Sequence, residues 1–316
     1  MIEGVRRVQD LMEQERYVTD RAIATTVFLA MELRKPILIE GPAGVGKTEV
    51  AKVLSQALET RLIRLQCYEG LDANTALYEW NFPKQMLRMR IEEGGGLSTQ
   101  EKEHLIFSES FLFKRPLLEA ITEADQSPVL LIDEVDRADE EFEAFLLEVL
   151  SDFQVTIPEL GTIKADHRPY VVLTSNRTRE LSDALKRRCL YLWIDYPSYE
   201  KEVRIIRNRV PKITEQLAAQ VAAFMQVARE LKLTKVPGIA ETIDWAVSLM
   251  ALHQEHLEAE SVSETLGCLF KDHEDIVRYA GPRMEKLVGA LAAVPFGELP
   301  EARDRVLAAV DGSAGR

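Results

Sequence analysis

The sequence predicts an α/β fold in which helices flank a parallel sheet, followed by a smaller all-α domain. Between residues 36 and 197, short apolar runs alternate with stretches of helical periodicity, the pattern of a parallel sheet with crossover helices. Residues 1–35 read as helical, and from Tyr199 onward the apolar residues recur only at helical spacing. The segment 195–198 marks the boundary between the alternating pattern and the purely helical one. We therefore expect two domains, residues 1–197 and 198–316.

A glycine-rich loop follows the first predicted strand. The apolar run 36–40 predicts a buried strand, and residues 48–58 predict an amphipathic helix. The loop between them fits the pattern G-x-x-x-x-G-K-[ST], in which backbone N–H groups and a helix N-terminus face phosphate. Lys47 would bridge the outer phosphates of a nucleoside triphosphate, and the Thr48 hydroxyl would bind Mg²⁺. The predicted loop residues are Gly41, Pro42, Ala43, Gly44, Val45, Gly46, Lys47 and Thr48.

Two adjacent carboxylates follow a second apolar run. Residues 129–132 predict a strand, and Asp133 and Glu134 stand at its end. A nucleoside triphosphatase with a phosphate loop needs an acid there to hold the Mg²⁺ shell, so we assign Asp133 to the metal through water. Glu134 is then the expected general base for the attacking water. Taken alone, this pattern also fits a solvated strand end, but together with the phosphate loop it predicts ATP hydrolysis.

A third predicted strand, 171–175, leads to Asn176, which could bond both the γ-phosphate and the lytic water. The alternative is an ordinary turn asparagine. A short helix after it ends in Arg187 and Arg188. Cations are favourable at a helix C-terminus, and the alternative is an arginine finger that reaches the nucleotide site of a neighbouring subunit.

The order of these motifs resembles that of the AAA+ ATPases, and among them the MoxR family, over nearly all of residues 17–200. The resemblance implies a P-loop AAA+ core and a helical lid. The glycine loop corresponds to Walker A, Asp133 and Glu134 to Walker B, and Asn176 to sensor 1. The sequence Tyr-Glu-Gly-Leu-Asp at 68–72 most resembles the branch of the family associated with carbon-monoxide dehydrogenase maturation.

Further roles follow only from the resemblance. The arginine finger falls on Arg188, with Arg187 as the alternative, and Tyr17 and Val18 stand where the family contacts adenine. The sequence departs from the family in the lid, because residues 236–245 contain no sensor-2 arginine. We assign no residue to that role.

Two segments resemble family inserts. Residues 67–80 resemble an insert that interrupts the second helix, and residues 153–164 resemble a β-hairpin before sensor 1. The alternation of apolar residues around Glu-Leu-Gly at 159–161 also favours a hairpin. In the first segment Leu77, Tyr78 and Trp80 could anchor a partner or pack in the core.

The resemblance implies a ring-forming homo-oligomer, a hexamer, that uses ATP and Mg²⁺ to remodel a protein client. It further implies a partner with a von Willebrand factor A domain and a client metalloenzyme. The alternative is a DNA-dependent AAA+ motor or a restriction-type translocation subunit. A third interpretation is a nucleotide-gated scaffold with negligible turnover, against which the intact Glu134 argues.

Composition limits these functions. The formal net charge of −13 argues against broad nucleic-acid binding, since that requires a positive surface. No apolar run approaches the roughly 18 residues of a membrane span, and the N-terminus lacks a signal-peptide pattern. The three cysteines form no paired pattern, which is typical of reduced thiols in the cytoplasm. His253 and His256, on a predicted helix, could bind a metal, but a solvated helical face is favoured.

Overall fold

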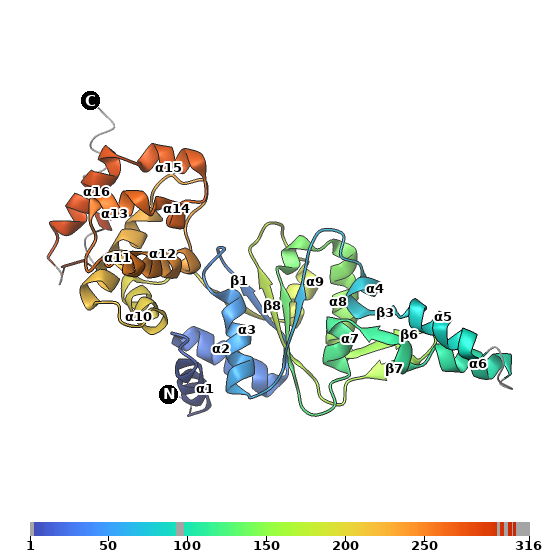
Figure 1. The fold of residues 1–316 in the computed structure, drawn as a ribbon. Coiled ribbons are helices and arrows are strands. Elements are labelled where there is room, and N and C mark those ends of the chain that lie inside the picture. The colour runs from blue at the N-terminus through green and yellow to red at the C-terminus, as the bar shows by residue number, and fades with distance from the viewer. Residues whose placement is uncertain (1–2, 93–97, 296–297, 300–302, 305, 308–316) are drawn as a thin grey trace. The chain divides into compact units, whose positions relative to one another are not determined.

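The computed structural model describes residues 3–92, 98–295, 298–299, 303–304 and 306–307. The chain forms two compact units. Unit 1 comprises the residues up to Glu15, Thr19–Gly41 and Lys47–Trp193. Unit 2 comprises Arg16–Val18, Pro42–Gly46 and the chain from Ile194 onward. Figure 1 labels many of the helices and strands of both units.

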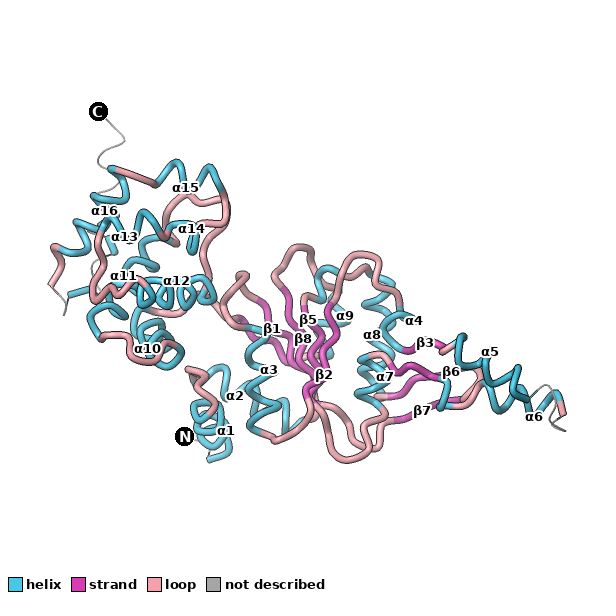
Figure 2. Tube along the Cα trace, in the orientation of Figure 1, coloured by secondary structure: helices cyan, strands magenta, loops and turns pink. Residues whose placement is uncertain are grey.

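A parallel sheet forms the centre of unit 1, as predicted. Its strand order is β2-β5-β8-β1-β9, and every pairing is parallel (Figure 2). The central strands are buried on both faces, which explains their uninterrupted apolar sequences. The strands are β1 (Ile37–Glu40), β2 (Leu62–Gln66), β5 (Val129–Asp133), β8 (Tyr170–Ser175) and β9 (Leu190–Trp193).

Side-chain caps fix the starts of several unit 1 helices. Asp20, Asp139 and Ser182 each accept a hydrogen bond from the backbone N–H three residues on, which satisfies a donor that the helix leaves free. The helices are α1 (Glu3–Gln14), α2 (Arg21–Leu33), α3 (Lys47–Ala57), α4 (Ala73–Leu77), α5 (Phe82–Ile91), α6 (Thr99–Ile106), α7 (Pro116–Ile121), α8 (Glu140–Asp152) and α9 (Asp183–Arg188), with 3₁₀ turns η2 (Glu109–Phe111) and η3 (Val135–Arg137).

The insert between β2 and α7 is longer than the predicted 67–80. It contains α4, then β3 (Tyr78–Trp80), α5, α6 and η2, and it ends in β4 (Leu112–Lys114), which pairs antiparallel with β3. Leu77 is buried, and Trp80 makes edge-to-face contacts with Tyr78 and Phe107. Leu77 belongs to the core of unit 1, and Tyr78 and Trp80 pack against that core. Five exposed large apolar residues lie further along, on α5.

The predicted hairpin is present. Strands β6 (Gln154–Ile157) and β7 (Gly161–Lys164) pair antiparallel, and the hydroxyls of Thr156 and Thr162 lie 3.1 Å apart. Val155 and Ile157 are buried against the core of unit 1. The alternation seen in the sequence thus has one face packed and the other exposed.

The described residues of unit 2 from Tyr199 onward form helices and no strand, as predicted. Its core surrounds the fully buried Trp245. The centre of the Trp245 ring lies 4.7 Å from that of the Phe224 ring, and the Trp245 Nε1 donates to the Thr265 hydroxyl. The helices are α10 (Tyr199–Arg209), α11 (Glu215–Ala228), α12 (Ile239–Ala251), α13 (Ala259–Glu264), α14 (Leu266–Leu269), α15 (His273–Tyr279) and α16 (Pro282–Ala292).

A buried ion pair also organises unit 2. The guanidinium of Arg229 donates two hydrogen bonds to the carboxylate of Glu202 on α10, at 2.6 and 2.7 Å. Arg229 also donates to the Pro237 carbonyl and the Thr242 hydroxyl. Its side chain is 6% exposed and that of Glu202 is fully buried. One arginine therefore joins α10, α11 and the start of α12.

Within unit 2, the loop segment Pro42–Gly46 lies against the start of α12. The Ile239 N–H donates to the Gly44 carbonyl at 2.8 Å. A Cβ at Gly238 would lie 2.7 Å from the Gly44 Cα, so the contact is possible only with glycine at 238. This is a backbone-to-backbone contact between a glycine loop and a helix N-terminus.

One sequence prediction is wrong here. His253 and His256 do not lie on a helix, because α12 ends at Ala251 and His253 adopts a left-handed φ of 57°. Among the described residues no group of three or more His, Cys, Asp or Glu side chains could hold a metal. The glycine-rich sequence at 92–99 predicts an exposed loop, and the residues after Pro300 predict one more helix and a short tail. Most of both segments lies outside the described residues. No described helix has the length and apolarity that crossing a bilayer requires.

Candidate nucleotide-binding site

The predicted site residues of unit 1 meet at one edge of the sheet. Lys47 and Thr48 begin α3 just after β1, Asp133 is the last residue of β5, and Asn176 follows β8. Because β1, β8 and β5 are parallel neighbours, their carboxyl ends lie side by side. In open α/β sheets this edge is where ligands bind.

The loop itself has the backbone of a phosphate cradle. Gly44 and Gly46 have φ values of 76° and 91°, which side-chain-bearing residues rarely adopt. The Lys47 ammonium donates to the Gly41 carbonyl at 2.8 Å and to the Asn176 amide oxygen at 2.7 Å. Burial lowers the pKa of Lys47, while Asp136, Asp133 and Glu134 oppose that shift. A phosphate bound beside this ammonium would favour its charged form and so oppose the effect of burial on the pKa.

Asp133 is buried, and both its carboxylate oxygens are engaged. Oδ1 accepts from the Thr48 hydroxyl at 3.0 Å and from the Thr174 hydroxyl at 2.5 Å. Oδ2 accepts from the Arg64 guanidinium at 2.5 Å. Thr48 and Asp133, assigned to the metal from sequence, are thus in direct contact. A hydroxyl and a carboxylate are the oxygen donors that Mg²⁺ prefers, and one or two carboxylates plus phosphate oxygens suffice to hold it.

Glu134 is more exposed and is held from three sides. Its Oε2 accepts from Gln66 and from Arg137, each at 3.1 Å, and its Oε1 accepts from the Asn176 amide at 3.4 Å. Its φ of 55° is left-handed, a strained conformation for a residue with a side chain. The structure therefore brings together Lys47, Asn176 and Glu134, as a general base beside a phosphate site requires.

Asp136 anchors the loop that carries Asn176. It is 2% exposed, and its Oδ2 accepts from the backbone N–H groups of Asn176 and Thr178 and from the Thr178 hydroxyl. Sequence reasoning missed this residue. The signal available was a third acid two residues after Glu134, but its partners lie some forty residues away in the chain.

Gln66 and Arg64 were also missed. They lie on β2, where Gln66 is level with Asp133 in the strand register, so both side chains reach the acidic strand end. The neighbouring Cys67 thiol is buried, and burial raises its pKa to about 12, with further support from nearby carboxylates. Cys67 is therefore not a nucleophile at neutral pH.

A cluster of polar and aromatic side chains lies beside the start of the loop. Glu40, the last residue of β1, is buried and accepts from the Tyr191 hydroxyl at 3.0 Å. Arg177 lies 3.8 Å from the same carboxylate and 5.9 Å above the Trp193 ring. These contacts link the residue before the loop to the residue after Asn176.

The remaining predicted residues lie elsewhere. Arg187 and Arg188 are exposed at the end of α9, and the Arg188 guanidinium donates to the Ser151 hydroxyl at 3.0 Å. In unit 2, Val18 is buried and Tyr17 is half-buried, in the turn between α1 and α2.

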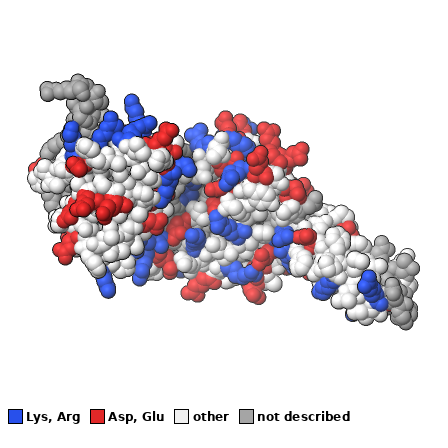
Figure 3. All heavy atoms as spheres, turned by 45° about the horizontal axis from the view of Figure 1, so that its top comes forward, with Lys and Arg blue, Asp and Glu red and all other residues white. Residues whose placement is uncertain are grey.

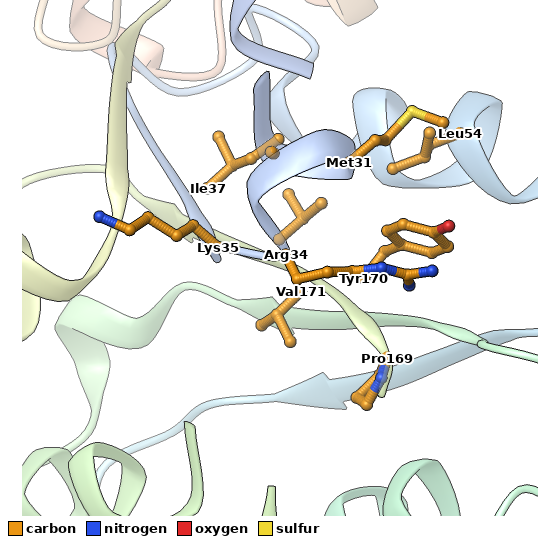
Figure 4. Close-up of a pocket in the computed structure, with 10 residues that line it drawn as sticks. Met31, Arg34, Lys35, Ile37, Leu54, Pro169, Tyr170 and Val171 are labelled. Atoms are coloured by element: carbon orange, nitrogen blue, oxygen red, sulfur yellow. The ribbon is translucent and has the colours of Figure 1, made fainter. Parts of the chain in front are cut away.

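A small hollow occurs at the opposite, amino-terminal edge of the sheet (Figure 4). It is lined by the end of α2, the start of β1 and the start of β8, including Arg34, Ile37 and Tyr170. The Arg34 guanidinium lies 4.5 Å from the centre of the Tyr170 ring. None of the predicted site residues reaches this hollow, so it is not the candidate site.

Comparison with known families agrees with the geometry at the sheet edge. Residues 36–189 match the family described as AAA domain (dynein-related subfamily). This part of the chain, just under half of its residues, is similar to an AAA domain. The match includes the glycine loop and ends at Cys189, directly after Arg188. AAA domains are P-loop nucleoside-triphosphatase domains, so the fold and the family agree on the class of ligand.

Individual relatives are more distant. An uncharacterized protein of Staphylococcus epidermidis is 27% identical over 241 residues, covering 74% of this chain and 81% of its own. The chaperone protein ClpB 2 of Parasynechococcus marenigrum is 33% identical over 149 residues, covering 45% of this chain and 14% of its own. Among solved structures, the Thermotoga maritima RuvB Holliday junction branch migration motor is 18% identical. The superposition covers 95% of this chain and 86% of the RuvB chain, with a TM-score of 0.44. The similarity to AAA domains rests on the family match, and the parallel sheet and glycine loop described above agree with it.

Proposed function

We propose that this protein is an AAA+ ATPase of the MoxR type that couples ATP hydrolysis to remodelling of a protein client. The observation that carries the proposal is the meeting of Lys47, Asp133, Glu134 and Asn176 at one sheet edge. These are the groups that binding a triphosphate and activating a water require. The resemblance to the branch associated with carbon-monoxide dehydrogenase maturation favours a metalloenzyme client.

The division of roles follows from the contacts. Lys47 and the loop N–H groups hold the phosphates, Thr48 and Asp133 hold Mg²⁺, and Asp133 acts through water. Bound Mg²⁺ supplies charge neutralisation between the phosphates. Glu134 takes the proton of the attacking water, and Asn176, already bonded to Lys47, aligns that water with the phosphate. Tyr17 and Val18 contact the adenine in this proposal.

The proposal includes a ring, a hexamer, in which Arg188 of one subunit reaches the nucleotide of the next. Arg187 and Arg188 are both exposed, which supports a role in a neighbouring subunit. Residues 1–197 are the nucleotide-binding core and residues 198–316 are the lid. The free thiols in the described chain support a cytoplasmic location.

A protein partner is supported by the surface of α5. Five of its large apolar side chains are 50–62% exposed: Phe82, Met86, Leu87, Met89 and Ile91. Aromatic residues and methionine are enriched at protein interfaces, and methionine adapts to partners of varied shape. Such a concentration of exposed apolar side chains on one short helix marks an interaction site.

The charge of α5 indicates which class of partner it binds. Lys84, Arg88 and Arg90 alternate with the apolar residues, and α5 contains no acidic residue. A helix that lies in a membrane separates its charged and apolar faces, whereas α5 mixes them. In the face that Figure 3 presents, basic side chains are scattered among acidic ones, which does not favour a nucleic-acid track. We propose that α5 binds an acidic, partly apolar segment of a von Willebrand factor A domain protein.

The experiment measures the affinity of the protein for a von Willebrand factor A domain protein of the same organism, by calorimetry with ATP analogue present. The double change Met86→Ser and Leu87→Ser should weaken binding at least tenfold, because it removes buried apolar contact. Leu33→Ser is the matched control, since Leu33 is 55% exposed on α2 and Leu87 is 60% exposed.

Two results would contradict the proposal. Equal effects of the control and the double variant would remove α5 as the contact. Stimulation of ATP hydrolysis by double-stranded DNA at physiological salt, with none by the protein partner, would favour a DNA-dependent motor instead.

A further inference from the structure

Arg64 occupies one side of the carboxylate that the proposed metal requires. Its Nη2 donates to Asp133 Oδ2 at 2.5 Å, while the two hydroxyl donors on Asp133 both use Oδ1. Oδ2 therefore has a single strong partner in the described residues, and that partner is a permanent cation. A divalent ion held by Asp133 would lie close to the guanidinium, and like charges repel.

The two members of this pair differ in freedom. The Asp133 side chain is 4% exposed, whereas that of Arg64 is 51% exposed. Asp133 is fixed by β5 and by two hydroxyls. Arg64 lies on β2, on the edge of the sheet, and its guanidinium can turn toward solvent without disturbing the core. Displacement of Arg64 therefore costs less than movement of Asp133.

Arg64 also contacts the residue that holds the proposed base. The same Nη2 donates to the Gln66 side-chain oxygen at 2.6 Å, and the Gln66 amide donates to Glu134 Oε2 at 3.1 Å. The Gln66 amide also donates to the Cys67 and Asp133 carbonyls, at 3.4 and 3.5 Å. Arg64 is therefore one of several contacts that hold Gln66 beside the proposed base.

We propose that Arg64 is a displaceable counter-cation that competes with the metal for Asp133. In the metal-free protein Arg64 neutralises Asp133. When metal and nucleotide are bound, Arg64 turns away from Asp133. Arg64 is a positioning residue. The inference rests on the proposed nucleotide site, and it concerns a residue outside the sequence motifs.

The test measures Mn²⁺ binding in the presence of ADP, with free Mn²⁺ followed by electron paramagnetic resonance. Arg64→Ala should tighten Mn²⁺ binding at least fivefold, because the competing cation is gone. Arg64→Gln keeps most of the stem and a polar tip without the charge, and it should tighten binding as well. The matched control is Arg61→Ala, which removes a cation just before the same strand. The partners of Arg61 are Glu119 and Glu123, and neither of these ion pairs involves Asp133.

The outcomes separate the inference from the proposed function. If the wild-type protein binds neither ADP nor Mn²⁺ with ADP, the nucleotide site is wrong and the inference fails with it. If the wild-type protein binds both, and the Arg64 variants bind Mn²⁺ no more tightly than Arg61→Ala, only the inference fails. Metal-free ADP binding by each variant, within twofold of wild type, reports that the site is folded.

Discussion

Asp133 and Glu134 are adjacent in the chain but have different surroundings, and the difference suits the two separate roles proposed for them. The Asp133 side chain is 4% exposed and has hydroxyl and guanidinium partners. The Glu134 side chain is 32% exposed and begins a turn with left-handed backbone. A buried carboxylate with fixed partners suits a metal shell, whereas a partly exposed one can meet water.

Changes at two residues should therefore separate binding from hydrolysis. Lys47→Ala should abolish nucleotide binding, because the ammonium contacts phosphate in the ground state. Glu134→Gln should bind ATP normally and hydrolyse it at least about a hundredfold more slowly, since general-base catalysis contributes at least that much. Fluorescent-nucleotide titration and phosphate release measure the two effects. Hydrolysis by Glu134→Gln at the wild-type rate would show that Glu134 does not activate the water.

At this scale the sequence predicts the residues that belong to local patterns. Lys47, Thr48 and Asp133 stand beside strands that are recognisable alone, and the structure brings them together. Gln66 and Arg64 could not be predicted, because their contact with Asp133 depends on the register of β2 against β5. Nothing in residues 62–66 taken alone indicates that register.

Among the elements of unit 2, α10, α11 and α12 are joined by the pair between Arg229 and Glu202. Both side chains lie almost completely out of water, and the guanidinium also satisfies the Pro237 carbonyl. Removal of one partner leaves the other as an uncompensated buried charge. The pair therefore matters more for the integrity of unit 2 than an exposed pair does.

Arg229→Ala should lower the free energy of unfolding by about 3–5 kcal/mol, the usual cost of breaking a buried pair. The control is Arg207→Ala, whose partner Glu215 is 67% exposed and whose loss should cost about 0–1 kcal/mol. Urea unfolding followed by circular dichroism compares them. Equal losses in the two variants would mean that the buried pair has no special structural role.

The sequence predicts regular elements better than their ends and their distant pairings. The sheet strands follow from apolar runs, and the β6–β7 hairpin from local alternation. The pairing of β3 with β4 joins Tyr78 to Lys114, so no local pattern reveals where the insert closes. At the end of α12, the Gln254 N–H bonds back to the Leu249 carbonyl around a left-handed His253. Glycine usually marks such an ending, and histidine in its place hides it.

For the whole molecule, the proposed ring predicts that subunits complement each other. Arg188→Ala should retain ATP binding but lose turnover by about 10³–10⁵-fold, the range for arginine fingers. Mixed with Lys47→Ala, it should recover activity, because roughly a quarter of the interfaces in a random ring join an intact site to an intact finger. Phosphate release from the mixture measures the recovery.

Arg187→Ala, tested alongside, identifies which of the two arginines acts. Absence of recovery in every mixture, together with a monomer at all ATP concentrations by light scattering, would exclude action between subunits.

The division of the molecule into units contains one feature that no sequence pattern indicates. The segment Pro42–Gly46 belongs to unit 2, although the residues on either side of it belong to unit 1. The cause is the backbone contact between Gly44 and Gly238, which two glycines far apart in the chain make possible. Spacing predicts the phosphate loop, but it cannot predict what the loop packs against.

The burial of Trp245 in unit 2 has a practical consequence for spectroscopy. The chain has three tryptophans, of which Trp80 and Trp193 lie in unit 1 and only Trp245 lies in unit 2. Trp245 is fully buried, whereas Trp193 is 43% exposed beside Arg177. An indole shielded from water emits at shorter wavelength and resists collisional quenchers. The intrinsic emission of the unlabelled protein therefore contains a separate optical signal from each unit.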